Sequence, residues 1–118
     1  MKRTTICAAL VLAAITSSAV AASHSGFAVV DSDGTLVRGS NGTSASNQGT
    51  GAYEVLFANT VRQCVFTAST GSAGSNGQNF PGFVTVAARE GNIRGVYVTT
   101  YDIAGNPADF AFHLNVRC

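Results

Sequence analysis

The chain is poor in positive charge and has almost no lysine. Its one lysine is Lys2, and charged residues make up only 11% of the sequence. No segment forms a basic stripe, and beyond the first 22 residues none has the periodicity of an amphipathic helix. These absences remove the electrostatic basis for holding phosphates and the apolar helix face needed to lie on a membrane. We therefore expect neither nucleic acid nor a membrane as a partner of the mature chain.

The sequence also lacks the spacings typical of metal and catalytic sites. His24 and His113 are its only histidines, and no C-x-x-C or H-x-x-x-H spacing occurs. Asp31 and Asp33 precede Gly34, but the other ligand positions of a calcium loop are missing, so a plain turn is predicted. No predicted strand carries paired carboxylates of the kind glycosidases use. We expect no metal, no cofactor and no enzymatic activity.

The first 22 residues have the three parts of a secretory signal peptide. Lys2 and Arg3 are followed by the apolar run 6–15, which ends in small residues with an A-x-A pattern at 19–21. A membrane helix is the alternative, but this run is shorter than the roughly 20 apolar residues that a span requires. The prediction is a signal peptide at 1–22 and one secreted domain at 23–118, extracellular or periplasmic. That domain keeps five arginines against six acidic residues.

Three cysteines occur, and the signal peptide would remove Cys7. Cys64 and Cys118 remain in a compartment where thiols are oxidised, which favours one disulfide between them. The chain-entropy model assigns such a long loop roughly 4 kcal/mol of stabilisation. We expect this disulfide to link the last strand of a sheet covalently to an interior strand. A site built from cysteine and histidine is the alternative.

The mature chain is predicted to be all-β. Short runs rich in β-branched and aromatic residues alternate with glycine, asparagine and aspartate turns, and no run has helical periodicity. This pattern predicts a small antiparallel β-sandwich or compact barrel of about six or seven strands, fastened by the disulfide. The expected strands are 27–31, 35–39, 52–58, 62–69, 83–89, 93–101 and 109–118.

Residue parity predicts which strand faces are buried. In the last strand one face carries only apolar residues and cysteine, and the opposite face carries His113, Asn115 and Arg117. Cys64 shares a face with Phe66, so both cysteines are expected to point inward. The inward set of the last strand is Phe110, Phe112, Leu114, Val116 and Cys118.

The strand 93–101 is ambiguous because both of its faces carry apolar or aromatic residues. If the valines at 96 and 98 face the core, Tyr97 and Tyr101 project outward. Asn115, His113 and Arg117 of the last strand would then lie beside them, and together these five form the candidate binding surface. In the alternative the two tyrosines belong to the core and the valines face out.

The runs "GAYEVLFANTVRQCVFTAST" and "GVYVTTYDIAGNPADFAFHLNVRC" resemble a family of small secreted bacterial β domains with no established activity. Such domains occur alone or behind collagen-like and fibre-like segments. The features that carry the resemblance are the strand at 51–57, Cys64, the turn at 107–109 and the terminal Phe-His-Leu…Cys. The strand spacing is more loosely similar to H-type lectin domains, which are trimeric sandwiches that bind sugars. The resemblance implies a β fold and transfers no ligand residue.

Two classes of function follow from these observations. The first is a non-enzymatic extracellular module for binding or self-association, whose partner is a second copy, a glycan, or a protein or other component of a cell surface. The second is a small secreted hydrolase or inhibitor with a site near His113, assembled with acidic residues of the loops.

Overall fold

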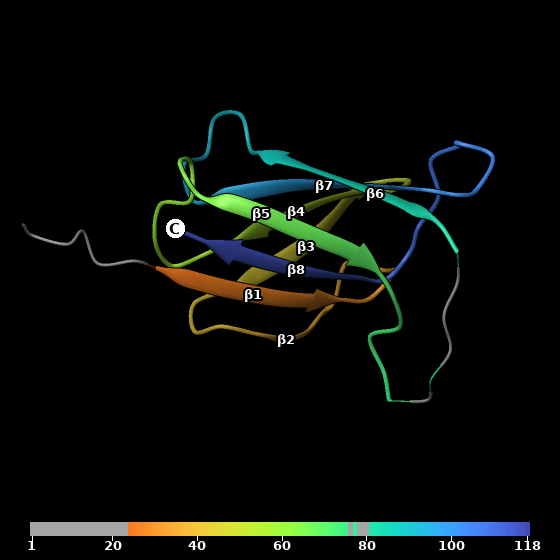
Figure 1. The fold of residues 1–118 in the computed structure, drawn as a ribbon, viewed down its shortest axis with the longest axis horizontal. Helices are drawn as coiled ribbons and strands as arrows, with labels where there is room; N and C mark the ends of the chain where they lie inside the picture. The colour runs from red at the N-terminus through yellow and green to blue at the C-terminus, as the bar shows by residue number, and fades with distance from the viewer. Residues whose placement is uncertain (1–23, 76, 78–80) are drawn as a thin grey trace, which may run out of the picture.

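The computed structural model describes residues 24–75, 77 and 81–118, and the predicted signal peptide lies outside them. The described residues form eight β-strands and no helix (Figure 1). The strands are β1 (Ser25–Val30), β2 (Leu36–Gly39), β3 (Ser44–Gly49), β4 (Ala52–Leu56), β5 (Val65–Thr70), β6 (Phe83–Ala88), β7 (Gly95–Tyr101) and β8 (Phe112–Arg117). The predicted all-β fold class is confirmed, with one strand more than expected.

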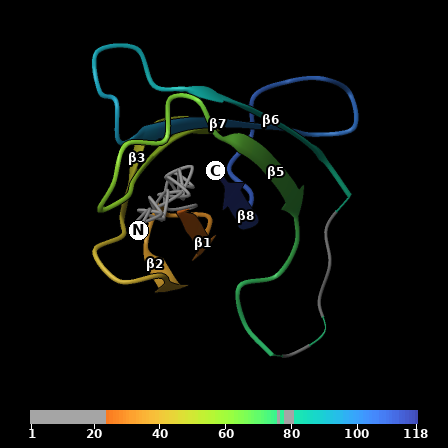
Figure 2. The same ribbon diagram turned by 60° about the vertical axis from the view of Figure 1, so that its left-hand side comes forward.

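The strands form two antiparallel four-stranded sheets. Sheet A has the order β2-β1-β8-β5 and sheet B the order β3-β4-β7-β6. Figure 2 shows the strands of both sheets arranged around one interior. On one side β5 of sheet A packs against β6 of sheet B, so the two sheets meet there. The fold is a compact β-sandwich.

The unexpected strand is β3, whose sequence SASNQG is almost wholly polar. Its one apolar side chain, Ala45, packs against the core. The strand pairs with β4 from Ser44 opposite Leu56 to Gly49 opposite Ala52. A polar, exposed edge strand carries no period-two hydrophobic signal, so pairing with β4 rather than sequence pattern makes this segment a strand.

The inward-facing residues of the two sheets pack into a single core. In β8 the predicted alternation is confirmed, because Phe112, Leu114 and Val116 are all buried. Phe112 meets Tyr53 of sheet B edge to face, with ring centroids 5.0 Å apart. This contact joins the inner faces of the two sheets.

The ambiguity in β7 is resolved by burial. Val96, Val98 and Thr100 are fully buried, while Tyr97 and Tyr101 alternate with them and are only half-buried on the outer face. The alternative that places the tyrosines in the core is therefore wrong.

The hydroxyl of Tyr53 has its hydrogen-bond partners at the end of the sandwich that carries the loops after β1 and β7. It donates a hydrogen bond to the Ser32 carbonyl oxygen at 2.7 Å, and Asp109 Oδ1 lies 3.3 Å away. Burial of the ring and the negative charge of Asp109 raise the pKa of Tyr53 to about 12. Tyr53 thus links β4 of sheet B to a loop of sheet A.

Asp109 orders the same end of the molecule. It was expected within the last strand, but β8 begins only at Phe112. Its Oδ1 accepts a hydrogen bond from the backbone N–H of Gly51 at 2.6 Å. Gly51 has a φ of 66°, and an added Cβ would lie 2.5 Å from the carbonyl oxygen of Thr100, so this turn requires glycine. Asp109 therefore holds the turn between β3 and β4 instead of extending β8.

The predicted disulfide between Cys64 and Cys118 is confirmed. The two residues lie opposite each other, one position beyond the pairing of Val65 with Arg117, with Cα atoms 4.2 Å apart. Because β8 is central in sheet A and β5 is its edge, the bond fastens an edge strand to the centre. The expectation that the last strand is tied to an interior strand is wrong, because its partner β5 is the edge and the last strand is itself interior. Cys64 is half-buried and packs against the core, whereas Cys118, at the end of the strand, is exposed.

Candidate functional site

The five residues of the predicted binding surface lie on two different outer faces. Tyr97 and Tyr101 belong to β7 in sheet B, whereas His113, Asn115 and Arg117 belong to β8 in sheet A. The connection 102–111 crosses from one sheet to the other rather than forming a hairpin within a sheet. The expectation that these residues lie side by side is therefore wrong.

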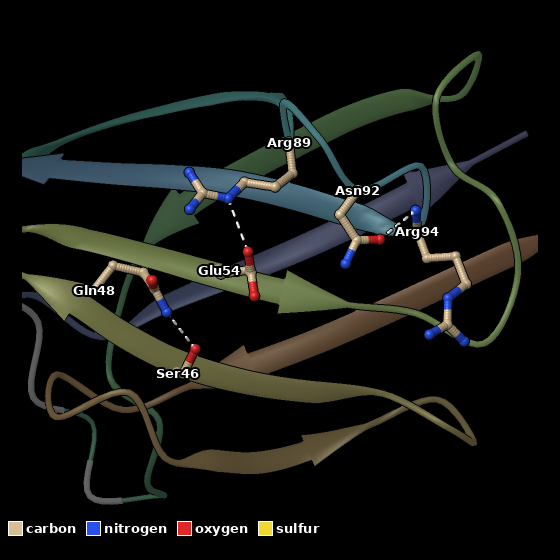
Figure 3. A network of polar contacts seen from close by, with 6 residues as sticks. All are labelled: Ser46, Gln48, Glu54, Arg89, Asn92 and Arg94. Carbon is tan, nitrogen blue, oxygen red and sulfur yellow. Dashed lines mark hydrogen bonds and ion pairs between the residues drawn. The ribbon is translucent and has the colours of Figure 1, made fainter.

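On the outer face of sheet B the long side chains bind one another. Arg89 Nε donates to Glu54 Oε2 at 2.8 Å, and the Arg89 guanidinium lies over the Tyr97 ring, 4.9 Å from its centroid. Figure 3 shows Arg89 reaching across β7 to Glu54 on β4. The face of Tyr97 is thus occupied by a cation from its own chain.

The rest of that outer face is a flat ladder of cross-strand pairs. The hydroxyls of Thr85 and Thr99 are hydrogen-bonded to each other. One rung further, Phe83 is paired with Tyr101 and is 56% exposed. This face therefore carries exposed aromatic edges beside paired polar side chains.

On the outer face of sheet A, six side chains from β1, β5 and β8 line a depression with a volume of about 340 Å³. They occupy two adjacent rungs of the sheet, one with Asn115 at its centre and the other with His113 at its centre. We call this depression the sheet A groove. Its side chains are Phe27, Asn115 and Thr67 in the first rung and Val29, His113 and Ser69 in the second.

The groove is bounded by the loop that follows β5. His113 Nε2 donates a hydrogen bond to the Ser72 carbonyl oxygen at 2.9 Å, and Arg38 Nη1 donates to the Ala73 carbonyl oxygen at 3.1 Å. Ala73 is only 5% exposed. Ser72 and Ala73 of this loop therefore lie against the second rung.

Small side chains and one exposed ring give the groove its shape and chemistry. Thr67 and Ser69 are short, while Phe27, opposite Asn115, is 48% exposed. Because Nε2 of His113 is a donor to the loop, Nδ1 is the ring nitrogen left for a ligand. The groove thus combines an apolar ring with neutral hydrogen-bonding groups on rigid central strands.

Sequence reasoning found His113 and Asn115 but missed the other lining residues. A signal for Phe27 was present, since FAVV places Phe27 and Val29 on one strand face and Ala28 and Val30 on the other. Because this segment has apolar residues on both faces, one of its faces had to be exposed to solvent or covered by residues from outside the sheet. Which face was exposed depended on the position of β1 in sheet A.

A second, smaller hollow of about 190 Å³ lies at the disulfide end of the sandwich. Its apolar side is formed by Phe57, Val61 and Val116, and its rim includes Asn41. It also adjoins His24, the first residue that the structure describes. The sheet A groove is the larger and lies wholly on strands, so we take it as the candidate site.

Within the described ranges, no group of three or more histidine, cysteine, aspartate or glutamate side chains is placed to hold a metal ion. In the same part of the chain no helix is long and apolar enough to span a membrane. A disulfide in an all-β domain is consistent with an oxidising, extracellular location.

Comparison of the chain with protein-family models, with curated proteins and with solved structures found no match. The resemblance to secreted bacterial β domains and to H-type lectins therefore stays a prediction.

Proposed function

We propose that this is a secreted, non-enzymatic binding module, extracellular or periplasmic, whose sheet A groove binds a sugar chain. The observation that carries the proposal is the exposed ring of Phe27 next to Asn115, Thr67 and His113 in a depression of about 340 Å³.

The chemistry of the lining favours a sugar over other ligands. A pyranose presents an apolar C–H face, suited to an aromatic ring, and a rim of hydroxyls that both donate and accept hydrogen bonds. Asn115 and Thr67 do both, and Nδ1 of His113 adds one more group. The groove is shallow and open, which suits one stretch of a longer chain rather than an enclosed small molecule.

The test compares two exposed phenylalanines on opposite outer faces. Phe27→Ala removes the ring from the groove, and Phe83→Ala removes a similarly exposed ring from sheet B. We expect glycan-array binding by the wild type, a loss of tenfold or more for Phe27→Ala and no loss for Phe83→Ala. Equal binding by both variants, or an array without any binding, would contradict the proposal.

The hydrolase alternative has one supporting observation, which is that Ser69 lies directly opposite His113 in the β5–β8 pairing. A nucleophile and base need a hydrogen bond between them. The hydrogen bond recorded for the His113 ring runs instead from Nε2 to the Ser72 carbonyl. We therefore keep binding as the proposed function, and a hydrolase substrate panel with Ser69→Ala as control tests the alternative.

A further inference from the structure

The sheet A groove lies on a face that carries positive charge without negative charge. The four strands of sheet A contain Arg38 and Arg117, but no aspartate or glutamate. Sheet B differs, because Glu54 lies on its outer face and pairs with Arg89.

Four aspartates lie in the loops at one end of the sandwich. Asp31 and Asp33 follow β1, and Asp102 and Asp109 precede β8, so all four belong to the loop end of the sandwich. Arg117 lies at the opposite end of β8, one rung beyond Asn115. The groove therefore runs from an acidic end beyond His113 to a basic end at Arg117.

The two arginines on the outer face of sheet A differ in their bonding partners. Arg38 donates to the Ala73 carbonyl oxygen and so helps to hold the loop. Arg117 is exposed, and within the part of the chain that the structure describes no carboxylate lies within ion-pair distance of it. Its neighbours in the rung, Val65 and Ser25, are uncharged.

We propose that the ligand of the sheet A groove is an acidic sugar chain, with a carboxylate or sulfate group bound by Arg117. This inference rests on the proposed function and adds the class and orientation of the ligand. The planar guanidinium fork fits a carboxylate or sulfate with two parallel hydrogen bonds. The opposite orientation would bring the anion towards the aspartates beyond His113, which repel it.

The test uses the purified, disulfide-bonded protein and four probes. The probes are an oligogalacturonate, a sulfated galactan oligosaccharide, a neutral galactan oligosaccharide of the same length, and a thymidine oligonucleotide of matched charge. Binding is measured by calorimetry at low and at physiological salt. We expect at least one acidic sugar to bind about tenfold tighter than the neutral one, with affinity falling as salt is added.

Three variants locate the charge that is responsible. Arg117→Gln should remove the tenfold preference, and Arg117→Lys, which keeps the charge without the fork, should retain part of it. Arg94→Gln removes an equal charge beside β7 of the other sheet and should change nothing. Melting curves of all variants check that each is folded.

The remaining outcomes distinguish the inference of an acidic sugar from the proposed function of sugar binding. Equal binding of neutral and acidic sugars, or a preference that survives in Arg117→Gln, would overturn the acidic inference and leave sugar binding intact. An oligonucleotide that binds as tightly as the acidic sugars would show that charge alone is recognised, which also overturns it. No binding of any sugar would remove the proposed function itself.

Discussion

The two outer faces of the sandwich are built on the same scaffold, a central pair of strands flanked by two edge strands, yet their side chains are arranged differently. On sheet B, Arg89, which follows β6, contacts both Glu54 of β4 and Tyr97 of β7. On sheet A, Thr67 and Ser69 are too short to fill the space beside Phe27, and a depression remains. The two faces therefore differ in side-chain length and in charge pairing, although their strand arrangement is the same.

A second difference lies in how each sheet is fastened. Sheet A has a covalent bond between its edge strand β5 and its central strand β8, and both strands line the groove. The described strands of sheet B contain no cysteine and rest on pairing and packing alone. The outer face that we assign to binding therefore belongs to the sheet whose edge strand β5 is fastened by a covalent bond.

The largest effect should come from removing the disulfide. Cys64→Ser and Cys118→Ser should each lower the free energy of unfolding by about 2–5 kcal/mol. Since each breaks the same bond, the double variant should cost little more than either single one. Chemical denaturation measures these values. Amide hydrogen exchange should then quicken in β5 more than in β6, and equal quickening would contradict the difference between the sheets.

An intermediate effect is expected at Tyr53, which links the sheets. Tyr53→Phe removes the hydroxyl donor to Ser32 and should cost about 1–2 kcal/mol, measured by denaturation. The pKa of Tyr53 is about 12 when folded, above the ordinary 10.0 of an unfolded chain. The wild type should therefore lose stability as the pH rises from 10 to 12, because the unfolded state releases this proton first. In Tyr53→Phe the loss of stability between pH 10 and 12 should be smaller. A dependence of stability on pH that is the same as in the wild type would mean that another group titrates.

The smallest effect is expected from the ion pair on sheet B. Arg89→Gln removes the contacts to Glu54 and to the Tyr97 ring, which are partly exposed, so the cost should be about 0.5 kcal/mol. Sugar binding should not change, because the groove lies on the other face. A loss of binding comparable to that of Phe27→Ala would mean that sheet B forms part of the site.

Much of the architecture follows from patterns that can be read along the chain. Alternation in FHLNVRC identifies the buried face of β8, and removal of Cys7 with the predicted signal peptide leaves Cys64 to pair with Cys118. The strand β3 could not be predicted in the same way, since SASNQG has no apolar period and becomes a strand by pairing with β4. The start of β8 was also missed, because Asp109 binds Gly51 instead of entering the sheet.

Local sequence determined the all-β class and the alternation of buried side chains, because each depends on residue type and on neighbours one or two positions away. The disulfide followed from the number of cysteines left after the predicted signal peptide. Only the tertiary structure decided that β7 and β8, consecutive in the chain, lie in different sheets, which separates Tyr97 from His113. It likewise brought Phe27 next to Asn115, residues far apart in the sequence. Strand order depends on how two faces cover a common core, and no single segment carries that information.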